Sequence, residues 1–166
     1  MTNLILLIVL LAGSGIVVCL AQRNCRKFTF HKLKYIKKSR NAVECITYEG
    51  ESPSGELVIP GYVKENTKLK VTSIGRSAFL YCGHITSLEI EEGVTAIGSY
   101  AFANCTGLQT IISRNTEYPH LGLHTFSNVK TAECTLFVPS SADITSQATG
   151  KWSIFTNIQR EEKKST

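Results

Sequence analysis

"VTSIGRSAFLYC", residues 71–82, is followed 23 positions later by the nearly identical "VTAIGSYAFANC", residues 94–105. Seven positions are shared, and all of them carry apolar or small side chains: Val71 and Val94, Thr72 and Thr95, Ile74 and Ile97, Gly75 and Gly98, Ala78 and Ala101, Phe79 and Phe102, Cys82 and Cys105. A repeat that keeps its packing residues and varies its polar ones repeats a piece of core. The pattern therefore predicts stacked structural units and not a duplicated catalytic site.

Each repeat unit is predicted to form one coil of a solenoid. "VTSIG" is typical of a short strand ended by Gly75, and "RSAFLYC" is long enough for a single helical or 3₁₀ turn. "HITSLEIEEG" alternates Leu88 and Ile90 with polar residues, the period of a strand with one buried face. One coil cannot cover Phe79, Leu88 and Ile90 by itself, so a neighbouring coil must pack against it.

Partial copies extend the repeat on both sides, which predicts a solenoid over residues 57–139. "LVIPGYV" at residues 57–63 matches "LEIEEGV" at residues 88–94, "LHTFSN" repeats the turn phenylalanine at Phe126, and "CTLFVP" at residues 134–139 repeats the strand. The stretch after Ile111, "SRNTEYP" included, departs from the repeat, so we expect an irregular coil there.

Two atypical segments are expected to cap the stack, because the end coils of a solenoid need covering. Within residues 22–56, "FTFHKLKYI" and "NAVECITYEG" predict two strands joined through "KKSRN", a β-hairpin over the first coil. Residues 140–158 predict the C-terminal cap, with Trp152 and Phe155 buried on the last coil or, alternatively, exposed as a ligand-stacking pair. Residues 159–166 form a polar tail.

Residues 1–21 are typical of a secretory signal peptide cleaved after Ala21. They are uncharged, apolar from Leu4 to Leu11, and end in the small-x-small sequence "CLA". Two alternatives stay open. The 17 residues from Leu4 to Leu20 are near the lower limit for spanning a bilayer, so a retained anchor is one, and a cytoplasmic protein is the other. We expect an exported protein, at the cell surface, in the periplasm or outside the cell, with membrane contact only through this segment.

The charge of the chain is unevenly distributed. Residues 22–40 hold eight basic and no acidic side chains, and since the whole chain has a net charge of +5, the remainder carries −3. The basic arm could be a patch for an anionic surface or a solvated stretch beside an export signal. Basic and aromatic residues do not alternate as they do on surfaces that bind single-stranded nucleic acid, so nucleic acid is not an expected partner.

The cysteines do not suggest a metal site. The five beyond residue 21 are an odd number without a CxxC pair, which argues against zinc: Cys25, Cys45, Cys82, Cys105 and Cys134. Cys82 and Cys105 occupy the same repeat position, so they should stack on successive coils as buried free thiols. A disulfide between them is the alternative, if their Cα atoms lie about 4.4–6.8 Å apart.

No catalytic constellation is visible. Asp143 is the single aspartate, no G-x-S-x-G elbow is present, and no P-loop or Rossmann fingerprint occurs. His31, His84, His120 and His124 lack metal-binding spacing, and Pro119 and Gly122 place the last two in a loop. The sequence therefore predicts a protein that is not an enzyme, with no cofactor and no metal.

The pattern V-T-x-I-G-x-x-A-F-x-x-C, followed by an L-x-x-I/L-x-I strand, resembles the BspA-like leucine-rich repeats of bacterial surface and secreted proteins. The match covers residues 57–139 by motif and extends to 28–158 if the entry and closing segments are included. The resemblance implies a right-handed leucine-rich repeat solenoid with parallel strands along one face, an exported protein, and adhesion or protein binding as its role.

Two functions are consistent with the sequence. The first is a non-catalytic binding module for an extracellular or surface protein or glycan, using polar strand positions that differ between copies. Those candidate residues are Thr86, Ser87, Glu89, Gln109, Thr110 and Ser113. The second is a shortened structural or accessory repeat protein with no ligand. A binding module should present exposed aromatic side chains or a coherent charged patch on the sheet face.

Overall fold

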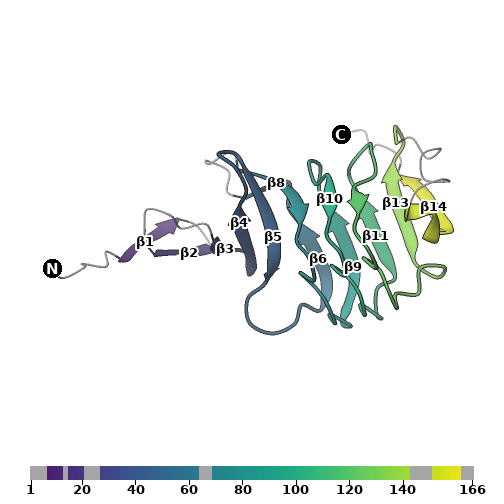
Figure 1. The fold of residues 1–166 in the computed structure, drawn as a ribbon, viewed down its shortest axis with the longest axis horizontal. Helices are drawn as coiled ribbons and strands as arrows, with labels where there is room; N and C mark the ends of the chain where they lie inside the picture. Colours follow the sequence, from purple (N-terminus) through teal and green to yellow (C-terminus); the bar gives the residue numbers. More distant parts are fainter. Residues whose placement is uncertain (1–6, 13–14, 21–26, 64–68, 143–150, 162–166) are drawn as a thin grey trace.

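The chain folds into a solenoid in which each coil contributes strands to two sheets (Figure 1). The computed structural model describes residues 7–12, 15–20, 27–63, 69–142 and 151–161. In this part of the chain four coils follow one another, built from the strand pairs β5 and β6, β8 and β9, β10 and β11, and β12 and β13. We number them first to fourth. The prediction of stacked, repeated coils is confirmed.

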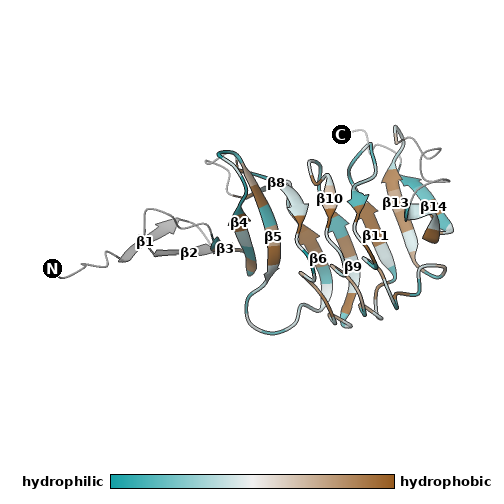
Figure 2. Cartoon of the chain, viewed as in Figure 1, coloured by the Kyte–Doolittle hydropathy of each residue, from teal (hydrophilic) through white to brown (hydrophobic). Residues whose placement is uncertain are grey.

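One sheet has five parallel strands in the order β14-β13-β11-β9-β6. Their bounds are β6 (Gly55–Ile59), β9 (Ile85–Ile90), β11 (Thr110–Ser113), β13 (Thr135–Pro139) and β14 (Asn157–Glu161). The two strands predicted from "HITSLEIEEG" and "CTLFVP" are β9 and β13. Hydrophobic bands recur along β6, β9, β11 and β13, whereas β14 is largely hydrophilic (Figure 2).

The other sheet has seven strands. The order is β12-β10-β8-β5-β4-β3, and β7 pairs with β8. The bounds are β3 (Lys27–Phe30), β4 (Leu33–Lys37), β5 (Ala42–Tyr48), β7 (Tyr62–Val63), β8 (Leu69–Ile74), β10 (Ala96–Ile97) and β12 (His120–Leu121). The coil strands β5, β8, β10 and β12 run parallel.

The N-terminal cap is the β3–β4 hairpin, which pairs with β5 of the first coil, so three antiparallel strands lie where the sequence predicted a two-stranded hairpin. The stretch "FTFHKLKYI" was expected to be one strand, and this is wrong: it forms β3 and β4, which pair antiparallel around a tight turn. His31 and Lys32 make that turn with φ angles of 46° and 62°. Two consecutive left-handed residues give the backbone twist of a two-residue hairpin. The strand β5 then joins this meander to β8.

A column of aromatic rings runs along the solenoid axis. Phe79 and Phe102 are both fully buried, with ring centroids 5.3 Å apart and planes at 6°. Phe126 continues the column at 5.6 Å and 9°, and Tyr48 of the first coil stacks on Phe79 at 6.3 Å. The predicted equivalence of Phe79, Phe102 and Phe126 is confirmed.

The segment between the two strands of a coil is not helical, so the prediction of a helical or 3₁₀ turn in each coil is wrong. The one helix in the described part of the chain is the 3₁₀ turn η1 (Lys151–Ile154). In the second coil, Ser77 and Tyr81 have φ angles of 54° and 64°, which interrupt a helix every few residues. Their N–H groups, with that of Phe79, instead donate to carbonyls of the third coil.

The C-terminal cap covers the last coil with aromatic side chains. Trp152 and Phe155 are 3% and 1% exposed, and both rings contact Phe126. The Nε1–H of Trp152 donates to the carbonyl of Pro119 at 2.7 Å. The prediction that these rings are buried is confirmed over the alternative of an exposed stacking pair. The strand β14 continues to Glu161, into the stretch predicted as a polar tail, because it pairs with the edge of β13.

Cys45, Cys82, Cys105 and Cys134 are free and buried, as predicted for Cys82 and Cys105. The Sγ of Cys105 donates to the carbonyl of Phe79 at 3.2 Å. Burial raises the pKa of the Cys105 thiol to about 12 and that of the Cys134 thiol to about 11. Since the thiolate is the reactive form, these side chains serve as small core hydrophobes and not as nucleophiles.

Part of the predicted signal peptide is described. The strands β1 (Leu7–Ala12) and β2 (Gly15–Leu20) pair antiparallel. The expected cleavage point after Ala21 lies outside the described residues, as do Cys25 and Asp143. Among the described residues, no helix is long and apolar enough to cross a membrane.

Candidate functional site

The outer face of the five-stranded sheet is the candidate site, because every strand in it presents alternate side chains to solvent. Strand register places equivalent residues of successive coils side by side. One outward row is Glu56, Ser87, Thr110, Thr135 and Asn157, and the next is Val58, Glu89, Ile112, Phe137 and Gln159. The inward rows between them include the buried Leu57, Leu88, Ile111 and Leu136. We call the two outward rows, together with Thr86, Gln109, Arg114 and Glu161, the sheet face.

Four of the six predicted binding residues lie next to one another at the start of β9 and β11. Ile85 and Leu88 are both buried although three residues apart, so Thr86 and Ser87 between them are left on the outside. Gln109 and Thr110 occupy the same place in the third coil, and the N–H of Gln109 donates to the carbonyl of Thr86 at 2.9 Å. Thr86 and Gln109 are exposed, and Ser87 and Thr110 are half-buried.

Ser113 does not belong to the sheet face, and its assignment to an exposed surface is wrong. It is 1% exposed and is aligned with the inward Ile90 of the neighbouring strand. Its Oγ has no hydrogen-bond partner among the described residues. Ser113 occupies the position that the neighbouring coils fill with Ile90 and Val138. Its polarity suggested an exposed residue, but the alternation of side chains along the strand turns it inward.

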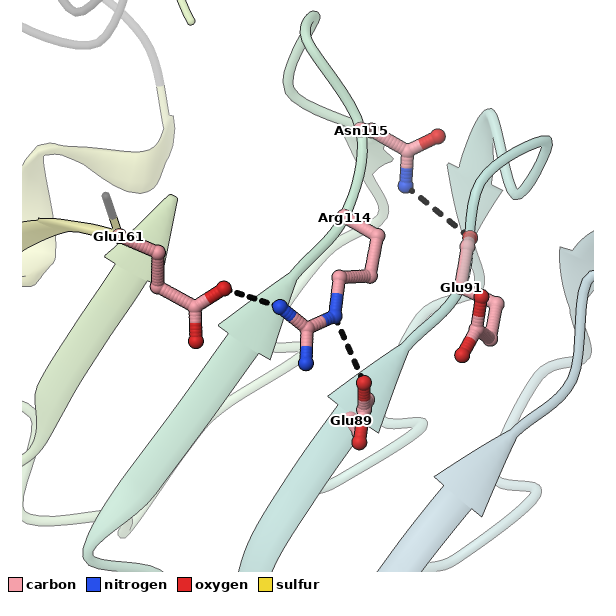
Figure 3. Close-up of polar contacts among 5 residues, drawn as sticks. All are labelled: Glu89, Glu91, Arg114, Asn115 and Glu161. Carbon is pink, nitrogen blue, oxygen red and sulfur yellow. Dashed lines mark hydrogen bonds and ion pairs between the residues drawn. The ribbon is translucent and has the colours of Figure 1, made fainter. Parts of the chain in front are cut away.

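Glu89 is on the sheet face but is held in an ion-pair network (Figure 3). Its Oε1 accepts a 2.7 Å hydrogen bond from the Nε–H of Arg114, and Arg114 Nη1 also contacts Glu161 of β14. The Glu89 side chain is 15% exposed. Partial burial lowers the pKa of Arg114, but the hydrogen bond and charge of Glu89, with the charges of Glu161 and Glu91, outweigh this and raise it. The guanidinium therefore stays charged between two carboxylates.

Asn115 secures the turn that leads out of β9. Its Nδ2 donates to the carbonyl of Glu91 at 3.3 Å (Figure 3). Its Oδ1 accepts from the N–H of Gly93 at 3.0 Å. Because these bonds connect the third coil to the turn of the second, they fix the strand ends on which Glu89 and Arg114 lie. The network therefore holds its polar groups in one arrangement.

An apolar centre on the sheet face was missed from the sequence. Ile112 and Phe137 are neighbours in the register of β11 and β13, and both are half-buried on the outward row. Val58, on the same row in β6, is 41% exposed. The period-two alternation of "CTLFVP" contains the signal, since Leu136 and Val138 point inward and Phe137 must then point outward.

The histidines do not converge. In the described part of the chain, no group of three or more His, Cys, Asp or Glu side chains is arranged to hold a metal ion. His120 is exposed in β12. His124 lies in the turn segment, the stretch that joins the two strands of a coil, and its ring stacks on that of Tyr100 in the preceding coil, with centroids 5.2 Å apart. His124 has a φ angle of 54°, which excludes the helix that could have aligned the two rings.

Stacked parallel strands and a repeat of 23 to 24 residues define a solenoid repeat protein. The family model for the BspA type leucine rich repeat region matches residues 69–163 in six copies, more than half of the chain. The protein belongs to the BspA-type leucine-rich repeat family, as the repeat motif predicted. Leucine-rich repeat proteins are generally non-catalytic scaffolds that bind other proteins.

One solved structure supports the fold, and a second is reported for comparison. A leucine-rich repeat protein from Bacteroides capillosus ATCC 29799 is 18% identical, with a TM-score of 0.57 over 82% of this chain and 99% of that one. A leucine rich cell surface protein from Faecalibacterium prausnitzii A2-165 is 23% identical over 81% of this chain and 32% of that one, with a TM-score of 0.45. Among curated proteins, no significant match is found.

Proposed function

We propose that this protein binds a partner protein through the sheet face and catalyses no reaction. The observation that carries the proposal is the apolar centre at Ile112 and Phe137 within a polar surround of Thr110, Thr135 and Arg114. Protein interfaces commonly have an apolar core with a polar rim, and aromatic residues and arginine dominate their binding energy. The half-buried ring of Phe137 on the outward row of the sheet face favours binding over the accessory role.

The predicted residues Thr86, Ser87, Gln109 and Thr110 supply adaptable hydrogen-bonding groups at the edge of this centre. Small polar side chains contribute little binding energy each, so affinity should depend on Phe137 and Ile112. A single domain then binds modestly, and several copies on one surface bind by avidity. Since five adjacent strands span only about 19 Å, the face suits one compact region of a partner.

The binding experiment compares Phe137→Ala with the unmodified protein. Beads carrying the protein are applied to immobilised extracellular matrix, and the off-rate is measured from detachment. We expect Phe137→Ala to weaken adhesion roughly tenfold, about 1.4 kcal/mol, because the aromatic ring is the largest apolar group on the sheet face. The matched control is Tyr62→Ala, which removes a 54% exposed aromatic ring from β7 of the other sheet.

Undiminished adhesion by Phe137→Ala, with the fold intact, would move the site to the basic residues 22–40. Equal losses in Phe137→Ala and Tyr62→Ala would show non-specific hydrophobic contact. If the unmodified protein does not adhere to matrix, the accessory role with no ligand is favoured.

We propose that the protein is exported to the cell surface, the periplasm or the outside of the cell. The reason is that residues 1–21 are apolar and end in the sequence "CLA". Mass spectrometry of the protein recovered from the producing cells should find an N-terminus at or next to Gln22. An exported protein that retains Met1 would support the membrane anchor, and an intact chain in the cytoplasmic fraction would contradict export.

A further inference from the structure

The turn segments of successive coils are joined by a regular hydrogen-bond ladder. In the second coil, the N–H groups of every second residue donate to carbonyls of the third coil: Ser77 to Ser99 at 3.0 Å, Phe79 to Ala101 at 2.8 Å, and Tyr81 to Ala103 at 2.9 Å. The third coil donates to the fourth in the same way: Tyr100 to Leu123 at 3.0 Å, Phe102 to Thr125 at 2.9 Å, and Asn104 to Ser127 at 2.8 Å. Each coil therefore presents three amide donors toward the C-terminal end of the solenoid.

In the fourth coil the equivalent donors are the N–H groups of His124, Phe126 and Asn128. His124 and Asn128 have φ angles of 54° and 60°, matching 60° and 61° at Tyr100 and Asn104. The backbone is thus shaped to donate as in the preceding coils. Within the described part of the chain, these three N–H groups have no acceptor. His124 and Asn128 are exposed, so their amide groups are accessible to a partner.

A groove of about 350 Å³ lies against this edge. Its lining combines the turn segment of the fourth coil with Thr131, Lys151 and Ile154. Two of the large apolar side chains in the lining are unusually exposed, Leu123 at 64% and Ile154 at 43%. The groove therefore offers apolar walls beside the amide groups of His124 and Phe126, which line it and have no acceptor among the described residues.

Lys151 gives the groove a positive charge. Its Nζ donates to the carbonyl of Leu121 at 2.9 Å and to that of Gly122 at 3.3 Å. An ammonium group has three N–H bonds, and among the described residues only two of them have acceptors, so the third is open to an occupant. Lys151 is the one Lys, Arg, Asp or Glu residue in the described lining of the groove.

We propose that this turn edge of the fourth coil is a docking site for a peptide segment of a partner protein. The segment adds to the solenoid as a further coil would, accepting from His124, Phe126 and Asn128 with backbone carbonyls two residues apart. It places an apolar side chain against Leu123 and Ile154 and an acidic side chain toward Lys151. This is addition of a strand-like segment to an open edge of the solenoid.

The first measurement is amide hydrogen exchange by NMR on the full chain. We expect the amides of His124, Phe126 and Asn128 to exchange at least tenfold faster than those of Tyr100, Phe102 and Asn104, the same positions one coil earlier. Equal protection in a dilute sample would show that the donors are already occupied within the chain and would overturn the proposal. Protection that appears only at high protein concentration would assign the edge to a second copy instead.

The second measurement identifies the chemistry of the occupant. A phage-displayed library of random nine-residue peptides is selected on the unmodified chain, and the enriched peptides should carry an acidic and an apolar residue. The best peptide should protect the three amides of the fourth coil and bind Leu123→Asp at least tenfold more weakly. Tyr81→Asp, which alters a 73% exposed side chain of a turn segment two coils away, should leave binding unchanged.

Charge reversal provides the specificity test, since selection on Lys151→Glu should enrich basic peptides in place of acidic ones. If that variant is unfolded, Lys151→Gln should lose the acidic preference without gaining a basic one. An absence of enriched peptides, or enriched peptides that bind without protecting the three amides, would overturn the proposal.

Discussion

Replacing Phe102 with alanine is expected to lower the free energy of unfolding by about 3–5 kcal/mol. The ring is fully buried between Phe79 at 5.3 Å and Phe126 at 5.6 Å, so truncation opens a cavity inside the aromatic column. Since the coils on both sides hold it, the column cannot collapse without breaking the hydrogen-bond ladder between turns. Urea unfolding followed by circular dichroism measures the loss as a lower midpoint.

Two controls separate the cavity from the mere loss of an aromatic residue. Phe102→Leu keeps most of the volume and should cost less than about 1.5 kcal/mol. Tyr81→Ala removes an aromatic ring that is 73% exposed and should change stability by less than about 0.5 kcal/mol. A Phe102→Ala midpoint equal to that of the unmodified protein would contradict the burial of this column.

Gly98→Ala is expected to destabilise the fold by about 3 kcal/mol, because there is no room for a Cβ between the second and third coils. A Cβ at Gly98 would lie 2.6 Å from the backbone nitrogen of Arg76 and 2.7 Å from the carbonyl carbon of Gly75. Both contacts are with backbone, which cannot rotate away. The coils would have to separate, weakening the 2.8 Å hydrogen bond from Gly98 N–H to the carbonyl of Ile74.

The graded controls for this prediction come from other glycines of the repeat. At Gly83 the nearest contact of a Cβ would be the side-chain Oγ1 of Thr106 at 3.3 Å, so Gly83→Ala should cost under about 1 kcal/mol. At Gly75 the nearest backbone contact is 3.3 Å, which predicts an intermediate loss. Thermal unfolding should order the three variants as Gly83, Gly75, Gly98 from the smallest loss to the largest. Equal midpoints for Gly83→Ala and Gly98→Ala would refute the close approach.

Most of the candidate site could be anticipated from local patterns. Alternation around Leu88 and Ile111 places Ser87 and Thr110 outside, and the structure agrees. The same alternation places Phe137 outside and Ser113 inside. Both positions were misassigned because the residues were sorted by polarity alone. The pairing of Arg114 with Glu89 and Glu161 could not be anticipated, since the partners are 25 and 47 residues away and meet only through strand register.

The sequence by itself determined the repeat unit, the strands β9 and β13, the equivalence of Phe79, Phe102 and Phe126, and the capping role of Trp152 and Phe155. These follow from side-chain period and repetition, which are local properties of the chain. Only the tertiary structure decided the form of the turns and of the N-terminal cap. The turns avoid helix because alternate N–H groups donate to the next coil, and β3 separates from β4 where His31 and Lys32 take left-handed conformations. Both depend on backbone partners distant in sequence, whose positions no local pattern specifies.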